Sequence, residues 1–312
     1  MTGNTAGLGP FAEGFRRRTP ASLISSRSFS QSLAAHRSPL PMTFPQRLAA
    51  LALLVVAAGC GATSGVRHST PEEAYQRGLT ALEGRKYDRA IEFFRGVLDY
   101  GRTNANEWAD DAQLGLARAY FRSGQYILAA TEYTRFSELY RADPRAVDAE
   151  YERALSYERL SPGYELDQTN TERALTYFRL FVERYPESPR TAEAEAKILE
   201  LRTKLARKAY ESARLYERRE LYEAAALTYE RAFADYPDAA FADDALVGAI
   251  RTYLRYAEQS VEARKAERLQ KAVDYYTRLL ELFPQSPVRA EAEALYAQVQ
   301  ARQAELGTTA RR

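Results

Sequence analysis

From residue 70 onward, small and aromatic residues recur at fixed distances along an otherwise polar chain. A small residue is followed twelve positions later by an alanine, and four positions after that by an aromatic side chain. This triplet occurs three times, as Gly78, Ala90 and Phe94, as Ala117, Ala129 and Tyr133, and as Ala213, Ala225 and Tyr229. Self-similarity of this kind predicts repeated helix-turn-helix units in which the small residues lie where paired helices cross closely.

Two further copies of the pattern carry insertions. They are marked by Ala154, Tyr157, Ala174 and Phe178, and by Gly248, Tyr253, Ala272 and Tyr276. The first insertion, at 161–170, contains Pro162 and Gly163 and is predicted to be a loop. The second, around 257–270, is charged and rich in alanine, which favours longer helices. The chain is therefore predicted to hold five helical pairs.

Capping residues followed by proline indicate where several helices begin: Thr70-Pro71, Asp143-Pro144, Ser188-Pro189 and Ser286-Pro287. We predict pairs over about 70–102, 107–141, 145–186, 205–237 and 241–284, a capping helix over 288–306 and a disordered tail over 307–312. The pattern resembles tetratricopeptide repeats. That resemblance implies an all-α, right-handed superhelical solenoid with a concave groove, within a folded region of 70–306.

One uncharged apolar run, residues 48–58, stands between Arg47 and the pair Gly59-Cys60. Eleven residues are too few for a membrane-spanning helix, and the layout is typical of a secretory signal. Ala57-Ala58-Gly59-Cys60 resembles a bacterial lipobox, which implies cleavage between Gly59 and Cys60 and acylation of Cys60. The alternative is an ordinary signal peptide with an accidental cysteine.

The other N-terminal segments follow from this interpretation. Translation could start at Met1 or at Met42, so residues 1–41 are an overextended start or a disordered leader, or else an organelle transit peptide. Residues 42–59 are then the lipoprotein signal peptide, and residues 60–69 a lipidated tether of small and polar residues.

Composition narrows the function. The chain has 312 residues with 44 Lys+Arg and 42 Asp+Glu, but residues 1–59 hold six arginines and one acid, so the remainder is slightly acidic and no nucleic-acid partner is expected. The two histidines, His36 and His68, precede the repeats, and Cys60 is the only cysteine. We therefore predict no metal site, no cofactor and no enzyme activity. Surface acids such as Glu193 and Glu195 leave a hydrolase as a remote alternative.

Candidate binding residues lie on the first helices and in one turn. Tyr75, Leu79, Arg118, Phe121 and Arg122 are candidates for a substrate groove, while Arg218 and Arg219 are predicted to lie exposed in the turn of the fourth pair. The repeat aromatics Tyr120, Tyr133, Phe178, Tyr229 and Tyr276 are expected in the core. Trp108, the only tryptophan, is expected to pack rather than to bind.

The repeats and the lipobox together resemble the BamD family of outer-membrane lipoproteins. The matching segments are Glu73-Ala74-Tyr75, Ala119-Tyr120-Phe121, Ala174 to Phe178, Tyr185 to Ser188, and Leu205-Ala206 with Tyr216 to Arg219. Tyr100-Gly101-Arg102 departs from the aromatic-Pro pair that is usual in the family. Gly61 follows the cysteine where retained inner-membrane lipoproteins often have Asp, which implies an outer-membrane protein facing the periplasm.

The resemblance also implies partners. The C-terminal repeats would dock on the POTRA region of BamA, the barrel-forming subunit, near Arg219. The N-terminal groove would receive the C-terminal signals of unfolded outer-membrane proteins, with Arg118 or Arg122 meeting the carboxylate and Phe121 or Tyr75 the terminal aromatic ring. Other lipoproteins of the assembly complex are further expected partners. The alternative is a CpoB-like periplasmic adaptor of the Tol system, since Tyr185 to Pro189 and Phe283 to Pro287 also fit its repeats.

Overall fold

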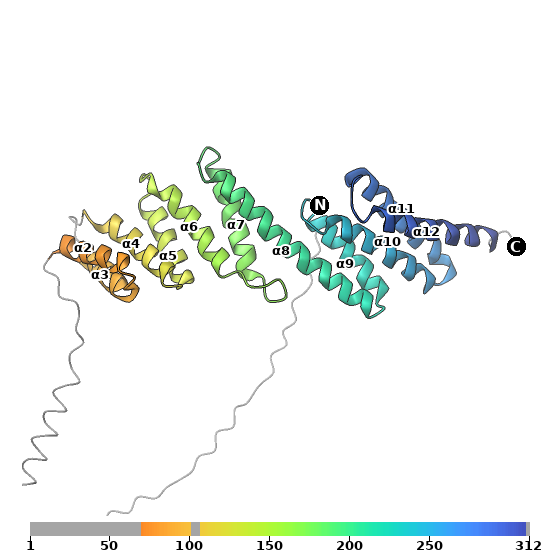
Figure 1. The fold of residues 1–312 in the computed structure, drawn as a ribbon, viewed down its shortest axis with the longest axis horizontal. Coiled ribbons are helices and arrows are strands. Elements are labelled where there is room, and N and C mark those ends of the chain that lie inside the picture. The colour runs from red at the N-terminus through yellow and green to blue at the C-terminus, as the bar shows by residue number, and fades with distance from the viewer. Residues whose placement is uncertain (1–69, 101–106, 310–312) are drawn as a thin grey trace, which may run out of the picture. The chain divides into compact units, whose positions relative to one another are not determined.

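A computed structural model describes residues 70–100 and 107–309, which form eleven helices and no strand (Figure 1). In chain order these are α2 (Pro71–Glu83), α3 (Tyr87–Tyr100), α4 (Ala109–Arg122), α5 (Tyr126–Leu139), α6 (Arg145–Arg159), α7 (Thr169–Arg184), α8 (Thr191–Arg218), α9 (Tyr222–Asp235), α10 (Ala242–Glu258), α11 (Glu262–Leu282) and α12 (Arg289–Thr309). Each packs on the next, and α12 also contacts α10. The predicted all-α, tetratricopeptide-like fold of five pairs and a final helix is confirmed.

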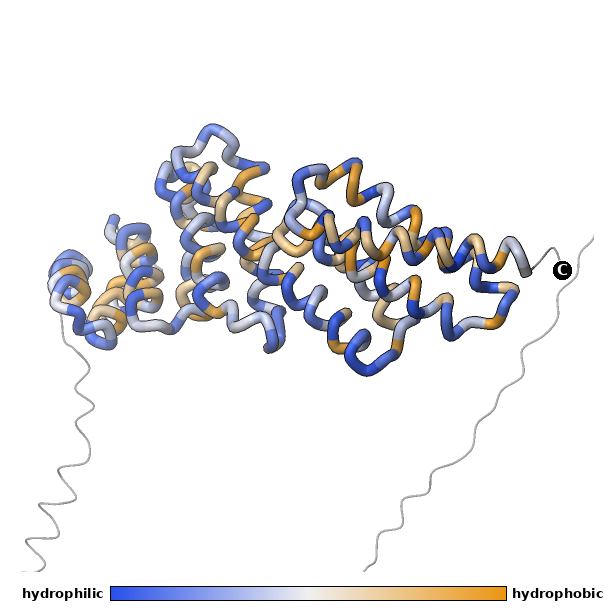
Figure 2. The backbone as a smooth tube through the Cα atoms, turned by 45° about the vertical axis from the view of Figure 1, so that its right-hand side comes forward, coloured by the Kyte–Doolittle hydropathy of each residue, from blue (hydrophilic) through white to orange (hydrophobic). Residues whose placement is uncertain are grey.

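The core is divided along the chain rather than gathered in one place. One buried cluster joins α2 to α6, a second joins α6, α7 and α8, and a third joins α8 to α12. Apolar and polar positions alternate along the helices in Figure 2, so each helix offers an apolar side to its neighbours. A helical pair therefore depends on the pairs beside it for burial.

Glycines allow the closest helix crossings, as the repeat spacing predicted. A Cβ atom at Gly78 or at Gly115 would lie 2.7 Å from the ring of Phe94, and one at Gly248 would lie 2.5 Å from the ring of Tyr229. Both rings are fully buried. An aromatic side chain from the second helix of a pair thus fills the space that the missing side chains leave.

Side-chain caps support the predicted helix starts, with small shifts. Thr70 Oγ1 accepts a hydrogen bond from the Glu73 amide at 3.1 Å and caps α2. Asp143 and Ser188 accept from amides two residues further on, at 2.8 and 3.3 Å. The helices after them begin at Arg145 and Thr191, because the prolines lie just outside the helices rather than in their first turns.

Two predicted boundaries need correction. The fourth pair does not begin at residue 205, because α8 runs without interruption from Thr191 to Arg218. Residues 307–309 are not a disordered tail, because α12 continues to Thr309. The first insertion is largely irregular chain between α6 and α7, and the second extends α10 and α11 to 17 and 21 residues, as predicted.

Candidate partner-binding surfaces

Helices α4 and α10 carry the same sequence pattern, Ala-Asp-Asp-Ala-x-x-Gly-x-x-Arg-x-Tyr-x-Arg. The first arginine of this pattern is Arg118 in α4 and Arg251 in α10. Arg251 pairs with Glu217 at 2.8 Å and with Glu291 at 3.2 Å. Arg118 is exposed and makes no ion pair within 4.0 Å in the described part of the chain. The arginine at this position is therefore neutralised by carboxylates in α10, whereas in α4 its guanidinium has no such partner in the described residues.

The surroundings of Arg118 hold an aromatic ring and a carboxylate. Tyr75 is half-buried; burial is the main cause that raises the pKa of its hydroxyl, and the charge of Arg118 opposes this effect. Glu152 of α6 has a raised pKa, chiefly through burial, while the charges of Arg190 and Arg118 act to lower it. We call the surface formed by Tyr75, Leu79 and Arg118 the α2–α4 surface. It presents a cation beside partly exposed apolar groups.

Tyr75 is held in place by other aromatic rings. Its ring centroid lies 5.2 Å from that of Trp108 and 6.0 Å from that of Phe94. Leu79 and Trp108 pack against the same N-terminal core. Trp108 is thus a packing residue, as expected, and its ring lies against that of Tyr75.

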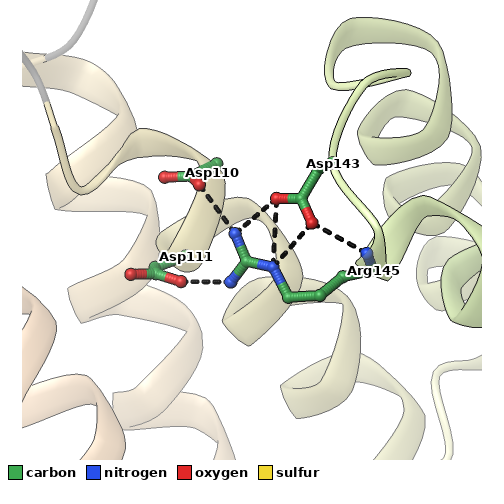
Figure 3. Close-up of polar contacts among 4 residues, drawn as sticks. All are labelled: Asp110, Asp111, Asp143 and Arg145. Atoms are coloured by element: carbon green, nitrogen blue, oxygen red, sulfur yellow. Dashed lines mark hydrogen bonds and ion pairs between the residues drawn. The ribbon is translucent and has the colours of Figure 1, made fainter.

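Arg145 gathers three carboxylates from two neighbouring repeats, as Figure 3 shows. Its guanidinium donates to Asp143 at 2.6 Å and to Asp110 at 2.7 Å, and it also binds Asp111. Asp110 and Asp111 begin α4, whereas Arg145 begins α6. This cluster ties the two helix starts together next to the α2–α4 surface, and the repeat pattern did not predict it.

Removing the Arg145 guanidinium is expected to destabilise the protein in a pH-dependent way. The hydrogen bonds from Arg145 hold the pKa of Asp143 below its ordinary value of 3.8. A depressed folded-state pKa stabilises the folded form above the unfolded value, and this contribution is lost as the pH falls through the folded value. Arg145→Gln should cost about 1–2 kcal/mol at pH 7, after allowance for its partial exposure, and clearly less below about pH 3.5. Urea unfolding at both pH values measures the difference.

Arg231→Gln is the control for this prediction, since Arg231 is 83% exposed and, among the described residues, pairs only with Asp235 one turn away. Its effect should stay small at both pH values. A cost for Arg145→Gln that is the same at pH 7 and pH 3.5 contradicts the assigned role of Asp143.

The other two groove candidates lie towards the α4–α5 turn. The Phe121 ring packs edge-on against Tyr126 of α5, with centroids 5.3 Å apart. Arg122 is exposed and lines a cavity shared with the α2–α3 turn. Tyr75, Leu79 and Phe121 thus pack against the same N-terminal core, and the charge of Arg118 acts on Tyr75. Arg122 lines a separate cavity.

The α8–α9 turn forms a second exposed surface. Arg218 ends α8 and Arg219 follows it, both exposed, and Glu220 takes a left-handed backbone with φ of 58°. Apolar side chains flank these arginines, with exposed fractions of 48% for Leu215 and 47% for Leu221. We call these residues, with Tyr216, the α8–α9 surface. Apolar groups beside guanidinium groups are typical of the centre of a protein interface.

Several predictions concern residues outside the described part of the chain. Gly59 and Cys60, the predicted cleavage and lipidation site, lie there. Among the described residues, no helix is long and apolar enough to cross a membrane. Those residues also contain no group of three or more His, Cys, Asp or Glu side chains placed to hold a metal ion.

The fold and its surfaces define a helical-repeat scaffold of the tetratricopeptide type. The model of the YfiO family, described as an outer membrane lipoprotein, matches residues 67–269. The chain therefore belongs to this family of outer-membrane lipoproteins, and the resemblance inferred from the repeats is confirmed.

Similar proteins carry a consistent name. Outer membrane protein assembly factor BamD of Caulobacter vibrioides is 29% identical over 54% of this chain and 56% of its own length, so the alignment spans little more than half of that relative. BamD of Vibrio cholerae is 26% identical over 77% of this chain and 98% of that protein. Among solved structures, a TPR repeats protein from Bacteroides fragilis has a TM-score of 0.42 and 17% identity, covering 75% of this chain and 100% of that one.

Proposed function

We propose that this protein is an outer-membrane lipoprotein scaffold of the β-barrel assembly machinery, anchored through Cys60 and facing the periplasm. The family match over residues 67–269 carries the proposal. The relatives named assembly factor BamD support it, and these matches favour it over a CpoB-like adaptor of the Tol system. In this role the protein works by binding, because its described surfaces offer charged and apolar contacts.

The α8–α9 surface is proposed to dock on the POTRA region of a BamA-like barrel subunit. Arg218 and Arg219 are adjacent and exposed, and neither makes an ion pair within 4.0 Å in the described part of the chain. A guanidinium can hold a partner's carboxylate through two hydrogen bonds, while Leu215 and Leu221 would bury apolar area around it.

Charge reversal at this surface tests the docking. Arg218→Glu/Arg219→Glu should reduce recovery of a POTRA-bearing barrel protein at least tenfold when the protein is purified in gentle detergent, because like charges repel across an interface. Arg231→Glu, on the exposed side of α9, is the matched control and should leave recovery unchanged. Recovery of Tol-system proteins alone from the parent would overturn the assembly role.

The α2–α4 surface is proposed to receive the C-terminal signal of an unfolded outer-membrane protein. Such a signal ends in an aromatic residue and a free carboxylate. Arg118 supplies a cation without an ion partner in the described chain, and Tyr75 and Leu79 supply partly exposed apolar contacts. Glu152 lies close enough to influence Arg118, so a peptide carboxylate has to displace part of that interaction.

Binding of a peptide that ends in phenylalanine checks this role. Arg118→Ala should weaken the peptide with a free carboxylate about tenfold, and should barely change the C-terminally amidated peptide, because only the first loses a charge-assisted hydrogen bond. Arg122→Ala should have the smaller effect, since Arg122 lines the neighbouring cavity. Equal affinities of parent and Arg118→Ala for both peptides would rule the role out.

A further inference from the structure

Two helix turns at the N-terminal end of the repeats line an open cavity of about 440 Å³ that neither proposed surface uses. The α2–α3 turn contributes Arg85 and Lys86, and the start of α3 adds Arg89. The end of α4 contributes Arg122. Four cationic side chains therefore surround one concave space. Asp88 is the only carboxylate among its lining residues.

The cavity is distinguished by the number of cations that line one concave space with a single carboxylate. Arg145 pairs with Asp110 and Arg251 pairs with Glu217, whereas other exposed arginines, such as Arg118 and Arg219, make no ion pair in the described residues. The four cavity cations are exposed, and in the described residues none of them has a carboxylate within 4.0 Å. Like charges held close together oppose folding unless an anion joins them. These four cations therefore offer a site that an anionic ligand could occupy.

Backbone amide groups at the starts of two helices add to the positive potential of the cavity. Gln125, which lines the cavity, is the residue at the N-terminal end of the 14-residue helix α5, and no side chain caps that helix. Tyr87, another lining residue, begins the 14-residue helix α3. The first amide groups of a helix lack partners within the helix, and the helix dipole favours negative charge there. Together with the four cations, these helix starts suit a phosphate group.

We propose that the cavity formed by Arg85, Lys86, Arg89 and Arg122 binds the phosphate of an anionic phospholipid headgroup. The choice of a lipid rests on the proposed anchor at Cys60. Nine residues, 61–69, lie between Cys60 and Thr70, so the chain from Cys60 to Thr70 spans at most about 36 Å, and α2, with 13 residues, is about 20 Å long. An anchor at Cys60 would thus limit the turn after α2 to about 56 Å from the attachment point, which permits contact with the headgroups. Basic residues near such a surface attract anionic lipids. The contact would set how the first repeats lie on the membrane.

Amide hydrogen exchange of the full lipoprotein tests this proposal. The protein is reconstituted into nanodiscs of phosphatidylethanolamine, with or without one quarter phosphatidylglycerol. Amides of residues 84–89 and 122–126 should exchange at least tenfold more slowly in the discs that contain phosphatidylglycerol. Arg85→Gln/Lys86→Gln/Arg89→Gln/Arg122→Gln should abolish the difference. The control Arg173→Gln/Arg179→Gln/Arg231→Gln/Arg264→Gln removes as many exposed cations outside the cavity and should retain it.

Other outcomes overturn the proposal. Exchange that is the same in both disc types excludes a lipid headgroup, and protection by inorganic phosphate at millimolar concentration without any response to phosphatidylglycerol assigns the cavity to a free anion. A copurifying acidic protein lost only from the cavity variant, with exchange insensitive to lipid, assigns it to a protein partner.

If the protein proves not to be acylated, vesicles of the same two compositions are added to it instead. The cavity variant should still recover the barrel subunit, so failure here is separate from failure of the docking role.

Discussion

Replacing Phe94 with alanine is expected to lower the free energy of unfolding of the first two helical pairs by about 3–5 kcal/mol. The ring is fully buried, and it fills the space left open by Gly78 and Gly115 on the two flanking helices. Neither glycine has a side chain that can relax into the void. The cavity therefore stays open, and the surrounding atoms lose their contacts.

The only tryptophan makes this loss measurable where it occurs. Trp108 lies against Tyr75, which in turn contacts Phe94, so its fluorescence reports the N-terminal pairs. Because each repeat contacts only its neighbours, the fluorescence transition in urea should move to lower concentration, while the later part of the circular dichroism transition stays nearly in place. Leu139→Ala, at a side chain that is 64% exposed, should change stability by less than about 0.5 kcal/mol. A change below 1 kcal/mol for Phe94→Ala contradicts the assigned packing.

The repeat spacing predicted this packing because it is a property of sequence distance. Gly78, Ala90 and Phe94 lie on one helical pair, and twelve-residue and four-residue spacings translate directly into facing positions across a helix crossing. The form of the two insertions could also be predicted from nearby residues. Pro162 and Gly163 interrupt a helix in the first insertion, whereas the second, around 257–270, has no such residues.

Contacts between helical pairs were harder to predict from the sequence. Arg145 reaches Asp110 and Asp111 thirty-five and thirty-four residues earlier, and this distance depends on how the second and third pairs stack. One sequence signal was available: the pattern Pro-Arg-x-x-acid-Ala occurs at Arg145 and again at Arg190. Arg190 pairs with Asp148 of the preceding repeat at 3.0 Å. Equal positions in successive repeats predict equal contacts, and the arginine at a helix start binds the acid of the preceding repeat.

The separation of the groove candidates has a similar cause. Arg118 and Arg122 are one turn apart on α4 and share a face, so sequence reasoning treated them alike. Arg122, however, stands in the last turn, where the end of α2 approaches, and it joins Arg85 and Lys86. Position along the helix axis decides which part of the neighbouring repeat a side chain meets, and the spacing of apolar residues does not report it.

Replacing Cys60 with alanine is expected to abolish lipid attachment completely. Cys60 is the only thiol in the chain, so no other residue can accept a thioether-linked diacylglycerol. Metabolic labelling with an alkyne analogue of palmitate should mark the parent and leave Cys60→Ala unlabelled. Arg219→Glu, which changes only a distant turn, should keep the full label.

The same experiment separates the two interpretations of the leader. Each buried methylene stabilises membrane attachment by about 0.8 kcal/mol, so several acyl chains hold the protein firmly where a single chain would not. A labelled parent that partitions into detergent supports the lipobox formed by residues 57–60. A parent that is cleaved near Gly59 but stays unlabelled and soluble identifies an ordinary signal peptide. In that case the first repeats are no longer held within tether reach of the membrane, and headgroup binding at Arg85 and Lys86 must then come from the cations alone.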